Sequence, residues 1–379
     1  MKVCIRCIYD ENTPGIYFNE NGVCNYCKMI DSLQEQFKTG TPEGEKEMQK
    51  IIETIKKKGK NKKYDCVIGV SGGTDSSFML AKAKEWGLRP LAVHYDNTWN
   101  TAIATENMRK VLCKLKIDLY THVVDNIESD DIFRSFFYAS VPEIDGPTDL
   151  ALAEVLYRAA SRYKIKYVLE GHSYKTEGVS PLGSSYIDGA YIKSIHKKFG
   201  KVKMRSFPNM TFFSFMKWVV LKRIKKIRPF WYINYSKEEA RNYLEKEFDW
   251  QYYGGHHLEN RMTAFNHSYY FPKKFKIDQR NNSLSALVRS GKLSKDEALK
   301  IYNQPPFIED ELLNYFKKRL KLCNKEFNEI MDRPAKTFKD YPTYKKRFER
   351  LRPLFYILAK ANLVPMSFYL KYCFPIDNR

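Results

Sequence analysis

Residues 71–77 read Ser71-Gly72-Gly73-Thr74-Asp75-Ser76-Ser77, and this stretch decides the fold that we predict for the chain. It follows a short apolar run at residues 64–70, which is typical of a buried central strand. From Ser76 to Trp86 apolar residues recur at helical spacing, and Gly87 stands where a helix is expected to end. A glycine-rich turn between a strand and a helix offers backbone N–H groups and the positive end of the helix dipole to an anion. The sequence therefore predicts a phosphate-binding loop.

Strand and helix patterns alternate on both sides of this loop. Further strands are predicted at residues 90–95, 120–124 and 167–170, and further helices at residues 104–115 and 150–162. Alternation of this kind predicts an α/β fold with a doubly wound parallel sheet. After about residue 176 the alternation stops, and we expect a mixed, largely helical C-terminal region.

The domain organisation follows from these patterns and from the cysteines near the N-terminus. We predict a four-cysteine zinc-binding unit at residues 1–30, a helical linker at 31–63 with a break near Gly40-Thr41-Pro42, and a nucleotide-binding domain at 64–176. A substrate-binding region is expected at 177–308 and a basic helical tail at 309–379. Ser236 and Ser294, each followed three residues later by a glutamate, predict two helix starts in the C-terminal half.

The residue types in the loop fit phosphate chemistry. Gly72 and Gly73 let the backbone approach a phosphate closely, and Ser71, Ser76 and Ser77 add hydroxyl donors. Asp75 repels phosphate, so we expect it to hold Mg²⁺ or to organise the loop. The loop has no lysine after its glycines and so is not a Walker A loop, and it lacks the dinucleotide-binding spacing.

The stretch SGGTDSS resembles the PP-loop of the ATP pyrophosphatases, which split ATP into AMP and pyrophosphate while adenylating a carbonyl oxygen. The resemblance implies ATP and Mg²⁺ as cofactors, with Ser71, Asp75 and Ser76 as catalytic residues and the whole loop, including Thr74 and Ser77, as the pyrophosphate cradle. It also places His94 and Asp96 beside the adenosine, and Gly171 and His172 beside the ribose or phosphates. An ordinary strand histidine is the alternative interpretation of His94.

Four of the eight cysteines lie within the first 27 residues, as Cys4-x2-Cys7 and Cys24-x2-Cys27. Two such pairs place four thiolates on one metal ion, and four sulfur ligands without histidine favour a closed, structural zinc site. An iron–sulfur cluster or redox disulfides are the alternatives. Cys66 and Cys113 fall on apolar faces and are expected in the core.

The combination of motifs is similar to the N-acetyl sugar amidotransferases of surface-polysaccharide and nonulosonate (pseudaminic- or legionaminic-acid) pathways. The matching blocks are the two cysteine pairs, the loop, Asp96-Asn97, residues 250–257 (Trp-Gln-Tyr-Tyr-Gly-Gly-His-His), residues 271–280 and 284–291, and Pro305-Pro306. The resemblance implies that substrate contacts come from Asn97, Tyr253, His256, His257, Glu259 and Arg280, with Lys193 a further basic candidate. A plain loop with surface histidines is the alternative at 256–259. Family members carry Gly-Glu-Asn where this chain has Gly171-His172-Ser173.

The implied reaction converts an acetamido group to an acetamidino group with ATP and ammonia, and yields AMP and pyrophosphate. The chain shows no glutaminase signature, so the resemblance implies a separate glutaminase subunit and a barrel-like subunit that channels ammonia. No apolar stretch is long enough for a membrane span and no signal peptide is evident, and we expect a cytoplasmic protein.

The formal charge of +21 favours anionic partners. Residues 197–228 hold eleven basic residues and no acidic one, with aromatic residues interleaved. We interpret this stretch as a solvated basic face, with a peripheral membrane contact or RNA as alternatives; RNA is disfavoured and DNA is not expected. Two other functions compete: a PP-loop tRNA-thiolating enzyme, which needs a cysteine pair or cluster near ATP, and a zinc-ribbon protein that binds RNA or membrane through a decayed nucleotide site.

Overall fold

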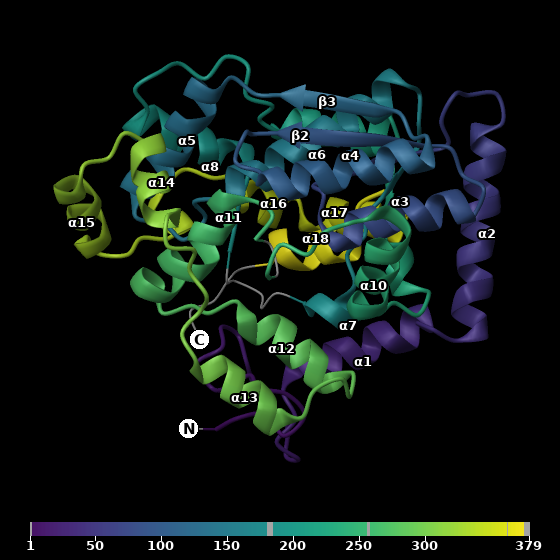
Figure 1. Cartoon of the computed structure of the whole chain (residues 1–379), viewed down its shortest axis with the longest axis horizontal. Coiled ribbons are helices and arrows are strands. Elements are labelled where there is room, and N and C mark those ends of the chain that lie inside the picture. The colour runs from purple at the N-terminus through teal and green to yellow at the C-terminus, as the bar shows by residue number, and fades with distance from the viewer. Residues whose placement is uncertain (1, 180–184, 256–257, 362, 375–379) are drawn as a thin grey trace.

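The chain was analysed as a computed structural model that describes residues 2–179, 185–255, 258–361 and 363–374 (Figure 1). Its centre is a five-stranded sheet formed by β1 (Cys66–Gly69), β2 (Pro90–Asp96), β3 (Leu119–Val123), β4 (Tyr167–Leu169) and β5 (Lys225–Ile227). The strand order is β3-β2-β1-β4-β5, and every pairing is parallel. The structure confirms the predicted α/β fold with a parallel sheet.

The central strands are buried on both faces because their side chains alternate between two cores. Val67 of β1 points into the larger core, whereas Cys66 and Ile68 point into the smaller one. The smaller core is covered by α2 (Pro42–Gly59), α3 (Thr74–Glu85), α4 (Ala102–Leu115) and α10 (Lys237–Phe248). The larger core is covered by α5 (Asn126–Ala139), α6 (Gly146–Arg162), α8 (Gly189–Phe199) and the C-terminal helices. Helices on both faces make the sheet doubly wound.

The fifth strand corrects the interpretation of the basic stretch. β5 lies within residues 197–228 and pairs with β4, so the sheet continues beyond the point where the alternation was expected to stop. Lys226 Nζ lies 2.6 Å from Glu170 Oε1, and Arg228 Nε lies 3.1 Å from Glu170 Oε2. Two of the eleven basic residues are thus neutralised at the sheet and do not belong to a solvated face.

Helix α5 was not predicted, because buried charges interrupt its apolar pattern. Glu128 and Asp131 are buried on α5 and accept hydrogen bonds from backbone N–H groups of residues 201–207. Arg134 also pairs with Asp131 at 3.0 Å. The start of the basic stretch is therefore fastened to α5 through its backbone.

The remaining elements surround this domain. The N-terminal unit leads into α1 (Asn25–Phe37), and the predicted break before α2 is present, with Lys38 in the left-handed region and Thr41 capping α2. The predicted capping residues Ser236 and Ser294 begin α10 and α13 (Lys295–Asn303). The other elements are α7 (Tyr174–Glu177), α9 (Phe212–Met216), η1 (Lys217–Leu221), η2 (Pro229–Trp231), α11 (Arg261–Phe265), η3 (Asn266–Phe275), α12 (Arg280–Arg289), α14 (Leu312–Arg319), α15 (Asn324–Asp332), η4 (Phe338–Asp340), α16 (Lys345–Arg350), α17 (Arg352–Lys360) and α18 (Met366–Tyr372).

Candidate functional site

The glycine-rich loop lies at the carboxyl end of β1 and leads directly into α3. β1 stands between β2 and β4, where the strand order reverses, and ligands of open α/β sheets bind at such a switch point. A methyl group added at Gly171, which follows β4, would lie 2.8 Å from the Asp75 carbonyl oxygen. The loop and the end of β4 are therefore in close contact.

The geometry of the loop requires a glycine at position 72. Gly72 has a φ of +83°, and a methyl group there would lie 1.9 Å from the Ala104 carbonyl oxygen at the start of α4. The Trp250 indole N–H donates to the Gly72 carbonyl at 3.1 Å. Ser71 Oγ accepts from the Gly73 N–H at 3.3 Å, and Ser76 Oγ donates to the Gly73 carbonyl at 3.2 Å. Two of the predicted serines thus shape the loop itself.

Asp75 is held by a network that the sequence did not reveal. Its carboxylate accepts a hydrogen bond from the Tyr235 hydroxyl and pairs with Lys237 Nζ at 2.9 Å. Lys237 also lies 3.6 Å from Glu177 Oε1, and Glu177 Oε2 lies 3.6 Å from His172 Nε2. The network joins the loop to the end of β4 and to the first turn of α10.

The charges in this network reinforce one another. Burial by itself would raise the pKa of Asp75, but Lys237 and the Tyr235 hydroxyl outweigh it and hold the pKa below its ordinary value. Burial would lower the pKa of Lys237, yet Asp75 and Glu177 raise it above its ordinary value. Asp75 is therefore ionised and Lys237 charged at neutral pH.

Two residues of the predicted substrate block, Tyr253 and Glu259, lie against the loop. A methyl group added at Gly73 would lie 3.1 Å from Glu259 Oε1 and 3.2 Å from the Tyr253 hydroxyl. The segment that contains Tyr253 is held against α4, because the Asn107 side chain exchanges hydrogen bonds with the Gln251 backbone at 2.7 and 2.8 Å. The structure thus brings Tyr253 and Glu259, which lie about 180 residues after the loop in the sequence, into contact with it. His256 and His257 lie outside the described residues.

The predicted residues at the end of β2 are engaged with neighbouring parts of the protein. The His94 ring is buried, with Nδ1 2.8 Å from the Val70 carbonyl, so it ties β2 to the start of the loop. Asp96 accepts from the Thr98 N–H at 2.7 Å. Asn97 is buried and accepts from the Trp99 N–H at 3.1 Å and from Asn260 at 3.2 Å. All three line the strand ends beside the loop, but these contacts order the polypeptide and do not require a ligand.

Two arginines show how the C-terminal region supports the site. Arg319 packs its guanidinium 4.2 Å from the Trp99 ring and donates to the Thr98 and Asn97 backbone, and so holds Thr98 at a φ of +58°. Arg280, a predicted substrate residue, instead binds Asp278 and the carbonyls of Ile301, Tyr302 and Gln304 at the end of α13. The structure places Arg280 in a capping position, and it places Lys193 on the exposed face of α8.

Sequence reasoning missed Tyr235, Lys237 and Glu177, although all three contact the Asp75 network. Lys237 stands at the first position of a predicted helix, where its sequence context is that of an ordinary capping box. Tyr235 and Lys237 meet Asp75 because α10 packs against α3, and Glu177 reaches Lys237 from α7. No spacing of residues in the sequence predicts this contact.

The four N-terminal cysteines form a second site with a different character. Their sulfur atoms are fully buried and lie within 4.8 Å of one another, with Cys4–Cys27 at 3.8 Å and Cys7–Cys24 at 3.9 Å. Four thiolates around one ion at about 2.3 Å are separated by about 3.8 Å, so the arrangement fits one tetrahedral metal ion. A multi-iron cluster holds its cysteines farther apart.

The cysteine unit is docked on α12 and α13, as Figure 1 shows. Arg289 Nη1 lies 3.9 Å from Cys27 Sγ, Lys295 donates to the Cys4 carbonyl at 2.7 Å, and the Tyr9 hydroxyl donates to Asn282 at 2.7 Å. α12 also packs against α7, which contains Glu177. A chain of contacts therefore joins the cysteine unit to the Asp75 network.

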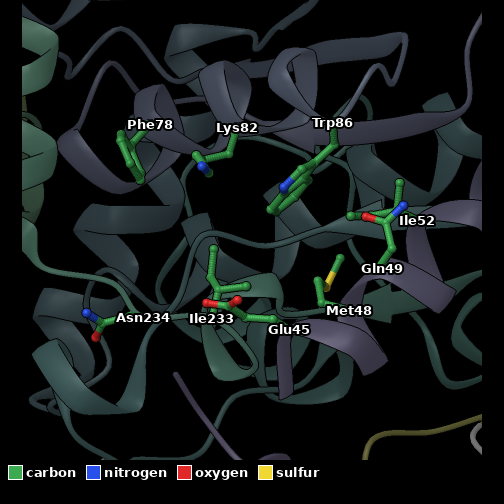
Figure 2. Close-up of a pocket in the computed structure, with 9 residues that line it drawn as sticks. All are labelled: Glu45, Met48, Gln49, Ile52, Phe78, Lys82, Trp86, Ile233 and Asn234. Carbon is green, nitrogen blue, oxygen red and sulfur yellow. The ribbon is translucent and has the colours of Figure 1, made fainter. Parts of the chain in front are cut away.

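A groove lies between α2 and α3 (Figure 2). It is lined by residues such as Met48, Ile52, Phe78 and Trp86, and it lies along the outer side of α3. It contains no helix N-terminus or glycine-rich backbone, so we place the candidate site at the strand ends instead.

Residues 259–352 match the family model described as "LPS biosynthesis protein WbpG-like, C-terminal domain". An uncharacterized protein of Methanocaldococcus jannaschii is 26% identical over 311 residues, which are 80% of this chain and 93% of that protein.

Two solved structures are similar to this chain at low identity and low TM-score. The NH3-dependent NAD synthetase of Campylobacter jejuni is similar with a TM-score of 0.32 and 15% identity, over 77% of this chain and 97% of that one. The U34-tRNA thiolase NcsA of Methanococcus maripaludis, solved with its [4Fe-4S] cluster, has a TM-score of 0.32 and 12% identity, over 86% and 99% of the two chains. Neither similarity is high enough to assign a reaction.

The sheet and the SGGTDSS loop define the class: a PP-loop-type α/β domain with an N-terminal four-cysteine cluster and a helical C-terminal region. Its residues 259–352 are similar to the WbpG-like C-terminal domain, which supports the family that the sequence motifs resemble. These findings support an ATP-dependent enzyme of glycan biosynthesis. No helix in the described part of the chain is long and apolar enough to cross a membrane.

Proposed function

We propose that this chain is an ATP-dependent N-acetyl sugar amidotransferase that converts an acetamido group to an acetamidino group. The observation that carries the proposal is the position of Glu259. It is the first residue of the WbpG-like match, and its carboxylate lies against Gly73 of the phosphate loop. The segment that relates the chain to glycan biosynthesis thus begins at the phosphate loop.

The chemistry proceeds in two steps. The amide oxygen attacks the α-phosphorus of ATP, pyrophosphate leaves, and an O-adenylated imidate forms. Ammonia then adds to the imidate carbon, AMP departs with the former amide oxygen, and an amidine remains. The protein has to position the amide oxygen and to stabilise the charge that develops on the phosphates.

The loop supplies the groups for this stabilisation. The first N–H groups of α3 have no partner within the helix and can donate to a pyrophosphate oxygen. Lys237 provides a positive charge beside the loop. Glu259 faces the loop, and we propose that its carboxylate helps to hold Mg²⁺ together with phosphate oxygens. Asp75 is engaged by Lys237 and by the Tyr235 hydroxyl. We therefore assign Asp75 to organising the loop.

For the cysteine unit we propose zinc. Four buried thiolates at tetrahedral separation form a closed site with no position for a substrate. Its role is structural: it holds α12 and α13, and through α12 it supports α7.

The competing tRNA-thiolation function has a specific structural difficulty. Cys66 begins β1, at the edge of the sheet opposite the loop, and is fully buried. Cys113, which we expected in the core, is instead exposed on α4, and Cys323 and Cys373 lie in the C-terminal region. None of these four cysteines lies in the loop or among the residues that we find around it. Sulfur transfer at this site would have to use the four cysteines of the closed unit.

Ammonia is expected from partner subunits, a glutaminase and a barrel-like channelling protein, since neither activity is evident in this chain. The acceptor is expected to be a surface-glycan precursor, including pseudaminic- or legionaminic-type sugars. The protein is expected to work in the cytoplasm.

The test is acceptor-dependent formation of AMP and pyrophosphate. Purified protein with ATP, Mg²⁺ and ammonium is incubated with N-acetyl sugars, nucleotide-linked N-acetyl sugars or unmodified tRNA. We expect AMP release only with an N-acetyl sugar, and much less from the Asp75→Asn variant. AMP release with tRNA and a sulfur donor, and none with sugars, would contradict the proposal.

A further inference from the structure

The C-terminal helices α17 and α18 are apolar on both of their sides. Phe355, Leu358 and Ala359 of α17 are buried, and Phe355 and Leu358 belong to the larger core. On the outside of the same two helices, exposed apolar side chains follow one another: Leu354, Tyr356, Ile357, Met366 and Leu370, with Ile357 64% exposed. A helix on a soluble domain normally turns polar residues outward. We call these five residues the α17–α18 face.

Part of the basic stretch at residues 197–228, namely α9 and η1, packs against these C-terminal helices. The Phe215 ring of α9 stacks on Phe368 of α18 at 4.8 Å, and Phe212 lies 5.6 Å from Phe348 of α16. α9 and η1 carry two more exposed apolar side chains, Phe213 and Leu221, which are 76% and 77% exposed. Exposed hydrophobic residues therefore concentrate on one packed unit built from two distant parts of the chain.

This unit is also strongly basic. Residues 341–374 contain seven basic residues, of which Lys345 is buried, and one acidic residue. Residues 201–225, without the two residues paired with Glu170, contain seven basic residues and none that is acidic. Lys346, Arg350, Arg352 and Lys360 are exposed around the α17–α18 face. Aliphatic side chains that point outward between lysines and arginines are the pattern of an interfacial segment.

We propose that the α17–α18 face binds the surface of an anionic lipid bilayer and holds the enzyme peripherally at the membrane. RNA fits the face less well, because leucine and isoleucine offer no ring on which a base can stack. A second copy fits less well, since two faces of the same positive charge repel each other. The proposal rests on the surface alone and is independent of the reaction at the phosphate loop.

The test is co-sedimentation of the full-length protein with vesicles. We expect binding to phosphatidylcholine vesicles that contain phosphatidylglycerol, weaker binding in high salt, and little binding to phosphatidylcholine alone. The Leu354→Ser/Ile357→Ser variant should lower the partition coefficient on the order of tenfold, and Lys346→Gln/Arg350→Gln should lower it by a similar factor. The matched controls are Ile301→Ser, an exposed isoleucine on α13, and Lys57→Gln/Lys58→Gln on α2. Thermal unfolding confirms that each variant is folded.

Several outcomes would overturn the proposal. One is the absence of binding to anionic vesicles. Another is binding that the two α17–α18 variants leave unchanged, or that the controls reduce equally. A third is an RNA oligonucleotide that binds in place of vesicles, and a fourth is concentration-dependent dimerisation that Leu354→Ser/Ile357→Ser abolishes.

Discussion

The phosphate loop and the cysteine unit are both short motifs, yet one is open and the other is closed. Every cysteine sulfur of the N-terminal unit is fully buried and surrounded by the other three. In the loop, by contrast, Ser71, Asp75 and Ser76 remain half-buried, and the helix N-terminus faces the strand ends. The difference separates a site that stabilises the protein from a site that can admit a ligand.

The largest expected effect is on the closed site. Cys4→Ser removes one of four ligands, so we expect loss of the bound metal and a decrease in the free energy of unfolding of about 3 kcal/mol or more. Elemental analysis and thermal unfolding measure both. Cys113→Ser, at an exposed cysteine on α4, is the matched control and should change neither. A metal-free Cys4→Ser protein with unchanged stability and activity would show that the cysteine unit is not structural.

The next largest effect is expected from a substitution that distorts the backbone of the phosphate loop. Gly72→Ala introduces a methyl group against the Ala104 carbonyl at a φ of +83°, and we expect ATP-dependent turnover to fall on the order of 100-fold. Gly291→Ala is the control, since Gly291 has a φ of +70° but no atom within 4 Å of an added methyl group. It should lower stability by about 1 kcal/mol and leave turnover unchanged. Equal losses of activity in the two variants would mean that the loop has no special role.

Asp75→Asn tests the charge that organises the loop. The asparagine retains a hydrogen-bond acceptor for Tyr235 but loses the ion pair with Lys237, so we expect turnover to fall by about 10–100-fold. Glu85→Gln, on the same helix and in an exposed pair with Lys82, should have no effect. Steady-state rates with saturating ATP give the comparison. Undiminished turnover in Asp75→Asn would remove Asp75 from the site.

The smallest expected effect concerns Glu170, which directly follows β4. Its carboxylate forms ion pairs with Lys226 of β5 and with Arg228. Burial would raise the pKa of Glu170, but Lys226 and Arg228 outweigh it and lower the pKa to about 2. The pKa is lower in the folded state than in the unfolded state, so this stabilisation is complete above the unfolded value and disappears as the pH falls toward 2. Glu170→Gln should therefore cost on the order of 2 kcal/mol at pH 7 and progressively less below about pH 4.5.

Urea unfolding of Glu170→Gln and of the unaltered protein between pH 3 and pH 7 checks this prediction. Glu106→Gln, on the exposed face of α4, is the control for removing a carboxylate. A difference in stability that does not depend on pH would show that the ion pairs at β5 do not contribute.

The two motifs could be predicted from the sequence because each is contiguous or nearly so. The loop needs only a strand before it and a helix after it, and the cysteine pairs need only a short connection between them. The surrounding network could not be predicted in this way. Tyr235 and Lys237 meet Asp75 across about 160 residues, and the contact depends on how α10 packs on α3.

Two elements, β5 and α5, were not predicted, and each has a physical reason. β5 contains three residues, two of them lysines, and becomes a strand only because β4 offers it a partner. α5 is buried together with its charges, which obscured the helical pattern of its sequence. Arg280 illustrates another limit: its sequence context does not show that the end of α13 engages it.

The most direct test of the proposed function is the mass of the product. An N-acetyl sugar incubated with the enzyme, ATP, Mg²⁺ and ammonium should give a product one dalton lighter, because NH replaces O, together with AMP. With heavy-nitrogen ammonium the product should regain the nominal mass of the substrate. A sugar of unchanged mass under both conditions, while ATP is consumed with another acceptor, would contradict the assignment of this site to amidine formation.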